Sequence, residues 1–303
     1  MQRVLVVYNP VSGLGLLRPS RERVRSAFNK HDAEIEWIET TPTLSDALRE
    51  AVQKPFDRIV VIGGDGTVRE IAQLLLSAGS RTPLAILGHG TGNMLAGSLG
   101  IPLFPLGTAV DFALNAPSDP IDVLRVNREH ISLIGAGQGY DALFIQGATR
   151  DMKRRLGMLA YALSFFRTFL PYIARRYTII VDGERHQVVA KLVLALNAFG
   201  VIGVPLERSI SAHDGWIDVF VLNPRTVWET IWTGIGFLVR MPRHKIPRLL
   251  TFRGKRVSIR QRKGRYVQID GDVHPGKHLD IELLPRALNV VHQQPVDAAG
   301  ASA

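Results

Sequence analysis

The sequence predicts an α/β N-terminal domain with a parallel sheet, followed by a second, mainly antiparallel β domain with inserted helices. Up to Asp119-Pro120, short apolar runs alternate with amphipathic helical segments, the pattern of a parallel sheet covered by helices on both faces. After this point, strand-like runs follow one another and end at Asp-Gly or other glycine turns. We therefore assign residues 1–121 to the first domain, residues 122–291 to the second, and residues 292–303 to a small polar tail that we expect to be mobile.

The elements of the first domain follow from its apolar runs and turn residues. Runs that close at turn residues predict buried strands at Val4–Tyr8, Ile35–Glu39, Arg58–Ile62 and Leu84–Leu87. Helices are expected at Pro19–Lys30, at Thr43–Gln53 with Thr43 or Ser45 as its N-cap, and at Thr67–Ser77.

The second domain is predicted to consist mainly of strands. They are expected at Ile121–Val126, Ile131–Gly135, Tyr177–Val181, Val188–Leu196, Ile217–Leu222, Arg256–Arg260 and Tyr266–Asp270. Asp182-Gly183 and Asp270-Gly271 have the composition of tight hairpin turns. Two inserted helices are expected near residues 151–173 and 226–239.

Composition excludes several kinds of site and favours anionic partners. The chain contains no cysteine, which excludes disulfides, thiolate zinc sites and cysteine nucleophiles. A net charge of +10 favours nucleic acid, anionic lipid headgroups or phosphorylated substrates. The most apolar stretch, Leu156–Ile173, is interrupted by Arg167 and Pro171, and the N-terminus lacks the features of a signal peptide. We therefore expect a cytoplasmic protein that associates peripherally with membranes.

Three glycine-rich turns each follow a predicted strand of the first domain. They are Asn9-Pro10-Val11-Ser12-Gly13, Gly63-Gly64-Asp65-Gly66-Thr67 and Gly88-His89-Gly90-Thr91-Gly92-Asn93. In a parallel sheet such turns share the carboxyl edge, and glycines let backbone N–H groups approach an anion. Any one of them could be an ordinary tight turn, but together they predict a polyphosphate site. No Walker A or protein-kinase signature is present, and the glycine spacing does not fit a Rossmann fingerprint.

Several motifs resemble one enzyme family. Gly63–Glu70 (GGDGTVRE) resembles the Gly-Gly-Asp-Gly-Thr-x-x-Glu motif of diacylglycerol kinases, sphingosine kinases and bacterial lipid kinases. Gly90–Ala96 with Leu99–Pro102, Asp214–Asp218 and Ile269–Asp272 resemble later motifs of the diacylglycerol kinase catalytic-domain family, in the same order. The resemblance covers nearly the whole chain and implies an ATP- and Mg²⁺-dependent lipid kinase that acts on a hydroxyl lipid such as diacylglycerol or a sphingoid base.

The resemblance also implies roles for individual residues. ATP is expected to contact Asn9, Pro10, Val11, Ser12, Gly13, Thr41, Gly64, Asp65, Gly66, Thr67, Val68, Arg69, Glu70, Thr91 and Asn93. Asp65 would act among the phosphates through Mg²⁺ or water, although it could equally cap a helix, and Asp122 would join this network. One carboxylate of Asp270 and Asp272 would accept the proton of the lipid hydroxyl, and the sequence leaves open which one.

A structural Mg²⁺ is implied at Asp214, with backbone carbonyls near Ser211 and Trp216. An Asp-Gly turn before the next strand explains Asp214 equally well. Met94 and Asp272 depart from the family pattern, which has Asp and Glu at these positions. Two alternatives therefore stay open: an NAD-kinase-like enzyme, which shares Gly-Gly-Asp-Gly-Thr, and a catalytically inactive lipid- or nucleotide-binding regulator.

Basic and aromatic residues cluster near the end of the second domain. Between Arg240 and Arg265 there are eleven Lys or Arg residues and no Asp or Glu. Trp228 and Trp232 precede this run, a combination that fits an interfacial helix on an anionic membrane. The alternative, which we favour slightly for the apolar residues, is that they cover the β core. No nucleic-acid-binding motif accompanies the charge, so we expect no nucleic-acid partner. A homodimer is implied by the resemblance alone.

Overall fold

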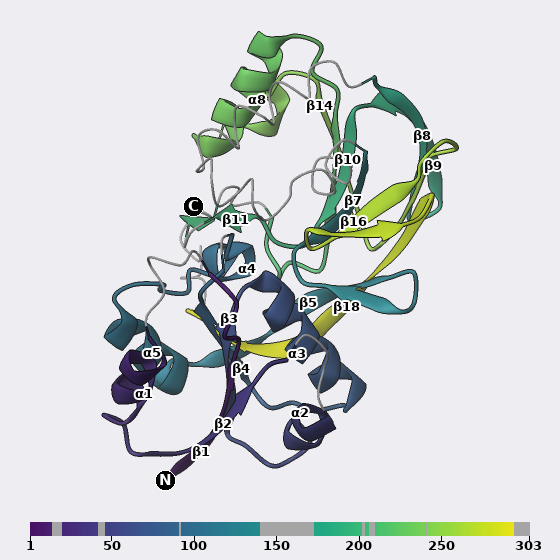
Figure 1. Cartoon of the computed structure of the whole chain (residues 1–303). Helices are drawn as coiled ribbons and strands as arrows, with labels where there is room; N and C mark the ends of the chain where they lie inside the picture. Colours follow the sequence, from purple (N-terminus) through teal and green to yellow (C-terminus); the bar gives the residue numbers. More distant parts are fainter. Residues whose placement is uncertain are drawn as a thin grey trace, which may run out of the picture. The chain divides into compact units, whose positions relative to one another are not determined.

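The computed structural model describes residues 1–13, 20–41, 46–90, 92–139, 173–201, 204–205, 210–239 and 241–293. The chain forms two compact units (Figure 1). Unit 1 comprises Met1–Ile121, Gly200–Pro205 and Arg286–Ala303, and unit 2 comprises Asp122–Phe199 and Leu206–Pro285. Two segments from late in the sequence therefore belong to unit 1. The helix expected near residues 151–173 lies outside the described residues.

Unit 1 contains a four-stranded parallel segment of sheet in the order β2-β1-β3-β4. The strands are β1 (Gln2–Tyr8), β2 (Ala33–Glu39), β3 (Arg58–Gly63) and β4 (Leu84–Gly88). After their polar first residues the central strands β1 and β3 are apolar because both their faces are covered, and Val4–Val7 and Ile59–Val61 are fully buried. The end of a later strand, β18 (His278–Val291), joins beside β4 through Val290 and Leu84.

Helices cover both faces of this sheet, as Figure 1 shows. Apolar residues of α1 (Arg21–Phe28) and α5 (Leu106–Asn115) pack on one face, while α2 (Asp46–Ala51) and α3 (Asp65–Ser77) lie on the other. The short α4 (Met94–Ser98) follows the third glycine-rich turn. Helix α1 is shorter than the sequence predicts because Ser20 caps it, accepting a hydrogen bond from the Arg23 N–H.

Unit 2 is an antiparallel β sandwich. One sheet has the order β14 (Leu249–Gly254), β13 (Ile217–Leu222), β10 (Leu192–Leu196), β7 (Gly135–Gly139), β16 (Tyr266–Ile269), β17 (Asp272–Pro275). The facing strands are β5 (Ser118–Val126), β6 (His130–Ser132), β8 (Arg175–Val181), β9 (Glu184–Ala190), β15 (Arg256–Arg260) and the first part of β18. Alternate residues from the two sheets fill one core, among them Tyr177, Ile179, Val193 and Val219.

The structure corrects the predicted strand Val188–Leu196. The chain leaves β9 at Ala190 and enters β10 at Leu192, and these two strands belong to different sheets. At the crossing, the Lys191 N–H donates to the Leu222 carbonyl.

The remaining elements are the hairpin β11 (Gly200–Val201) and β12 (Val204–Pro205), the helix α8 (Val227–Leu238) and the 3₁₀ turn η2 (Arg243–Lys245). Within the described part of the chain, no helix is long and apolar enough to cross a bilayer.

Candidate functional site

The three glycine-rich turns meet at the carboxyl edge of the parallel strands in unit 1. They directly follow β1, β3 and β4, which lie side by side. Hydrogen bonds join them, from the Asn9 N–H to the Ile62 carbonyl (2.9 Å) and from the His89 N–H to the Gly63 carbonyl (2.8 Å). The arrangement that the sequence predicts for these turns is therefore present.

Glycine is required where two of these turns press against each other. A Cβ on Gly90 would lie 2.6 Å from the Gly64 Cα, closer than non-bonded carbon atoms approach. Gly13 has a φ of +100°, and a Cβ there would lie 2.6 Å from the His89 carbonyl oxygen. Backbone therefore packs against backbone where these turns meet, and close-packed glycine turns of this kind can present N–H groups to phosphate oxygens.

Polar side chains hold this surface in place. The Asn9 Nδ2 donates to the Thr67 Oγ1 (2.7 Å), which connects the first turn to α3. Asn93 adopts a left-handed conformation (φ 44°) and closes its own turn, accepting from the Gly90 N–H (2.7 Å) and donating to the Gly90 carbonyl (3.0 Å). Both residues are therefore fixed by neighbours within the site.

Asp65 is the first residue of α3, and its carboxylate lies at the start of α4. Its two oxygens accept hydrogen bonds from the N–H groups of Met94 (3.2 Å) and Leu95 (3.3 Å). Asp65 therefore caps α4, whereas α3, which it begins, has Gly64 as its N-cap and no side-chain cap bond. At position 94 the backbone N–H makes this bond, so the methionine side chain does not prevent it.

The other residues predicted to contact ATP differ in exposure. Thr41 is exposed and follows β2, at the same edge of the sheet. Val11 is 81% exposed, whereas the Val68 side chain is buried in the core, so only its backbone could reach a ligand. Arg69 and Glu70 continue α3, and Thr91 lies outside the described residues.

Asp270 and Asp272 flank one glycine in unit 2 but have very different surroundings. Asp270 and Gly271 both have positive φ (48° and 84°), as in a tight type I′ hairpin between β16 and β17. The Asp270 carboxylate accepts from the Ser132 Oγ (2.5 Å) and from the N–H groups of residues 133 (2.9 Å), 134 (3.0 Å) and 135 (3.0 Å). Burial raises the pKa of Asp270, and these hydrogen bonds oppose the rise. Asp272, by contrast, is exposed at the start of β17.

Asp122 is almost completely buried in unit 2, where it holds a loop. Its Oδ2 accepts from the Gly215 N–H (2.8 Å), and its own N–H donates to the Ala212 carbonyl (2.6 Å). The buried Asn197 Nδ2 donates to the carbonyls of Asp122 (2.9 Å) and Leu133 (3.0 Å). Asp122 and Asn197 thus fix the loop that carries Asp214.

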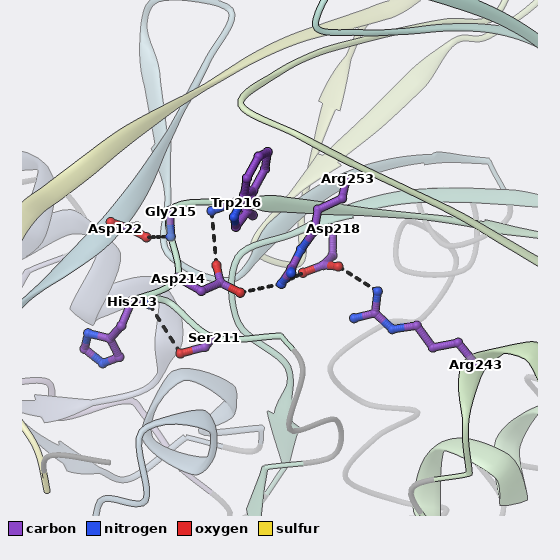
Figure 2. Close-up of polar contacts among 9 residues, drawn as sticks. All are labelled: Asp122, Ser211, His213, Asp214, Gly215, Trp216, Asp218, Arg243 and Arg253. Atoms are coloured by element: carbon purple, nitrogen blue, oxygen red, sulfur yellow. Dashed lines mark hydrogen bonds and ion pairs between the residues drawn. The ribbon is translucent and has the colours of Figure 1, made fainter. Parts of the chain in front are cut away.

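Asp214 lies in a network of alternating charges (Figure 2). One of its oxygens accepts from the Trp216 N–H (3.1 Å), and the other is paired with Arg253. Arg253 also contacts the buried Asp218 (3.3 Å), which pairs with Arg243 at 2.7 Å. Burial raises the pKa of Asp214, and the charge of Arg253 opposes this rise.

The network bears on the structural metal site expected at Ser211, Asp214 and Trp216. The Ser211 carbonyl accepts from the Asp214 N–H (3.4 Å), and both Asp214 oxygens already bind protein groups. A guanidinium thus supplies positive charge where the resemblance implies Mg²⁺, so the donor set fits a metal poorly and the metal ligands stay a prediction. Sequence reasoning missed Arg253, although Asp218 and Arg253 face each other directly in the β13–β14 register.

Two family models match this chain, one in each half of the sequence. Residues 3–126 match the family model described as the diacylglycerol kinase catalytic domain. Residues 135–292 match the model described as the YegS C-terminal NAD kinase beta sandwich-like domain. The second match alone covers more than half of the chain.

Two relatives and one solved structure are similar to most of the chain. A diacylglycerol kinase of Bacillus subtilis is 29% identical over 236 residues, covering 76% of this chain and 77% of that protein. An uncharacterised Synechocystis protein, sll0036, is 23% identical over 303 residues, covering 94% of this chain and 69% of the relative. A solved structure titled as a diacylglycerol kinase from Bacillus anthracis superposes with a TM-score of 0.74 at 23% identity, covering 96% of this chain and 97% of that one.

Proposed function

Because this chain belongs to the diacylglycerol kinase catalytic-domain family, we propose that it transfers the γ-phosphate of ATP to the hydroxyl group of a lipid. Diacylglycerol and sphingoid bases are the acceptor classes that we propose to test first. The observation that carries the proposal is the meeting of three glycine-rich turns at one sheet edge, where backbone N–H groups can surround phosphate oxygens.

The phosphate site would use backbone groups and the start of α3. This helix runs for 13 residues from Asp65, and its N-terminal end favours negative charge. Mg²⁺, when bound, would neutralise charge on the phosphate oxygens, and Asp65 is the residue that would hold it directly or through water. Asn9, Thr67 and Asn93 would keep the turns in position, because their side chains bond within the site.

Asp272 is the better candidate for the proton acceptor. Asp270 already accepts four hydrogen bonds that anchor residues 132–135, whereas Asp272 is exposed. In the proposed step, the lipid hydroxyl gives its proton to the Asp272 carboxylate while its oxygen forms a bond to the γ-phosphorus. The bond from that phosphorus to the β–γ bridging oxygen breaks, and ADP leaves.

Radiolabel transfer tests the proposal. Purified protein is incubated with [γ-³²P]ATP and Mg²⁺ in mixed micelles that each contain one lipid acceptor, with NAD⁺ as a parallel soluble acceptor. We expect label in an organic-extractable product and none with an Asp65→Ala variant. Label in NAD⁺ alone would support the NAD-kinase-like alternative, which the description of the second domain keeps in view. Absence of label everywhere, with ATP binding intact, would favour the inactive regulator.

A further inference from the structure

Helix α8 exposes a stripe of large apolar side chains. Trp228 is 71% exposed, Trp232 52%, Ile235 38% and Val239 60%. Their spacing of four, three and four residues places them on one face of the helix, with Val239 at its C-cap. The interpretation that these residues cover the β core is therefore wrong, because they face solvent.

The opposite face of α8 holds the helix on unit 2. Thr230 and Thr233 are buried, and their hydroxyls donate to the carbonyls of Thr226 (2.9 Å) and Glu229 (2.7 Å). The Thr233 hydroxyl also contacts the Pro247 carbonyl (3.3 Å). Satisfied hydroxyls can be buried without the cost of unpaired polar groups. The face that packs thus carries these threonines together with Phe237, and the stripe of exposed apolar residues is left outward.

Close packing fixes this orientation of the helix. A Cβ on Gly236 would lie 3.0 Å from the Ile246 side chain, so the helix approaches the chain after η2 closely there. Phe237 meets Phe199 and Phe220, with ring centroids 5.6 Å apart in both pairs. Rotating the tryptophans inward would break these contacts. The exposed stripe is consequently a built feature of the surface.

Basic residues flank helix α8 in the sequence and in the segment that packs against it. Arg225 precedes α8, and Lys245 and Arg248 lie in the segment that packs against it; all three are exposed. The one acidic residue between Asp218 and Asp270 is Glu229, and it pairs with Arg248 (3.3 Å). We call the four apolar residues and these three basic residues the α8 surface. Its composition joins aromatic and aliphatic groups to positive charge that Glu229 compensates only in part.

We propose that the α8 surface docks this protein on anionic lipid bilayers, with the apolar stripe inserted at the headgroup level. Tryptophan is enriched at that depth because its ring is apolar and its N–H is polar. Basic residues beside such a stripe gain attraction from anionic lipids. The inference rests on the proposed function in one respect, since a lipid kinase must meet its acceptor at a membrane.

Vesicle flotation in the absence of ATP tests the docking directly. The probes are vesicles of phosphatidylcholine alone and of phosphatidylcholine mixed with phosphatidylglycerol. Wild-type protein should float with the mixed vesicles, and a Trp228→Gln/Trp232→Gln variant should bind at least about tenfold more weakly. Val189→Gln is the matched control, because Val189 is 51% exposed on β9 of the same unit. An Arg225→Gln/Lys245→Gln variant should bind the mixed vesicles more weakly than wild type does, with a smaller change for vesicles of phosphatidylcholine alone.

Activity measurements separate this proposal from the kinase proposal. The double tryptophan variant should phosphorylate a water-soluble short-chain acceptor like wild type and lose activity on the same acceptor class in vesicles. Vesicle binding without turnover on any lipid would overturn the kinase proposal and leave the docking intact. Unchanged vesicle binding by the double variant would overturn the docking. A shift from dimer to monomer in that variant, with unchanged vesicle binding, would instead make the stripe an interface between copies of this chain.

Discussion

An Asp270→Asn substitution changes one oxygen of a carboxylate that four donors share. Oδ1 accepts from Ser132, residue 134 and residue 135, while Oδ2 accepts from the Leu133 N–H at 2.9 Å. If the amide oxygen keeps the three donors, the amide NH₂ faces the Leu133 N–H, donor against donor. Asparagine tolerates the positive φ of this turn as well as aspartate does, so the backbone does not confuse the comparison.

The expected loss of stability follows from these bonds. An unsatisfied Leu133 N–H costs about 1–3 kcal/mol, and three bonds that lose their charge assistance weaken further by roughly 1–2 kcal/mol in total. Removing a buried charge offsets part of this cost, because burial raises the pKa of Asp270. We expect a net loss of about 3 kcal/mol, which corresponds to a fall in Tm of roughly 6–12 °C for a unit of this size.

Asp272→Asn is the matched variant. Its carboxylate lies on an exposed strand end, so Tm should change little while lipid phosphorylation falls by roughly 10²–10⁴-fold. Tm is measured by circular dichroism, and turnover is measured well below the lower Tm. An Asp270→Asn variant with unchanged Tm and no turnover, beside an active Asp272→Asn variant, would reverse the two assigned roles.

The pH dependence of stability gives a second readout for Asp270. With its pKa raised in the folded state, this carboxyl keeps its proton to a higher pH than in the unfolded chain. Its contribution to the free energy of unfolding therefore falls as the pH rises from the ordinary aspartate pKa through the raised one. Asp270→Asn should lack this decline, so the difference in free energy of unfolding between the variant and wild type should become smaller as the pH rises.

Two further predictions concern the phosphate site and the charge network. Gly90→Ala should lower the free energy of unfolding by about 1–3 kcal/mol and weaken ATP binding measured by calorimetry, because its Cβ meets the Gly64 Cα. Gly107→Ala in α5 is the control, because a Cβ there meets nothing, and it should change neither quantity. Equal effects of the two variants would contradict the backbone contact. Arg253→Met should cost about 1–3 kcal/mol in chemical denaturation, because Asp214 and the buried Asp218 lose a partner. The loss should shrink at acidic pH as the Asp214 carboxyl, whose pKa burial raises, is protonated. Arg260→Met is the control, because Arg260 and Asp280 form an exposed ion pair at 4.0 Å, and it should cost about 0–1 kcal/mol. Equal losses of stability in the two variants would contradict a stabilising role for the Arg253 network.

Sequence patterns predicted the parallel sheet and the glycine-rich turns because both depend on local signals. An apolar strand followed by glycines specifies a buried strand and a close backbone turn without reference to distant residues. The change of sheet at Lys191 was missed because Val188–Leu196 is apolar without interruption except at that residue. The strand β18 was missed because most of its pairing partners, in β15 and β4, are specified only by the folded structure.

The roles of Asp270 and Asp272 could not be separated by sequence because each flanks Gly271 and the distinction lies in the N–H groups of residues 133–135. The sequence also did not predict that the apolar stripe of α8 faces outward. Hydrophobic periodicity locates an apolar face but does not say whether protein covers it. Here the threonine hydroxyls donate to carbonyls of their own helix, which lets Thr230 and Thr233 lie beside Phe237 on the face that packs.

The return of late segments to unit 1 has a consequence for how the chain is made. During synthesis, β1 to β4 leave the ribosome long before Gly200 and Val290, yet Gly200 fits so closely on the α4 backbone that a Cβ would lie 2.3 Å from the Ser98 N. Until Val290 arrives beside Leu84, β4 presents a free edge that can pair with another chain. A fragment that ends at residue 121 would therefore be prone to aggregate, and unit 1 is completed only after nearly the whole polypeptide has emerged.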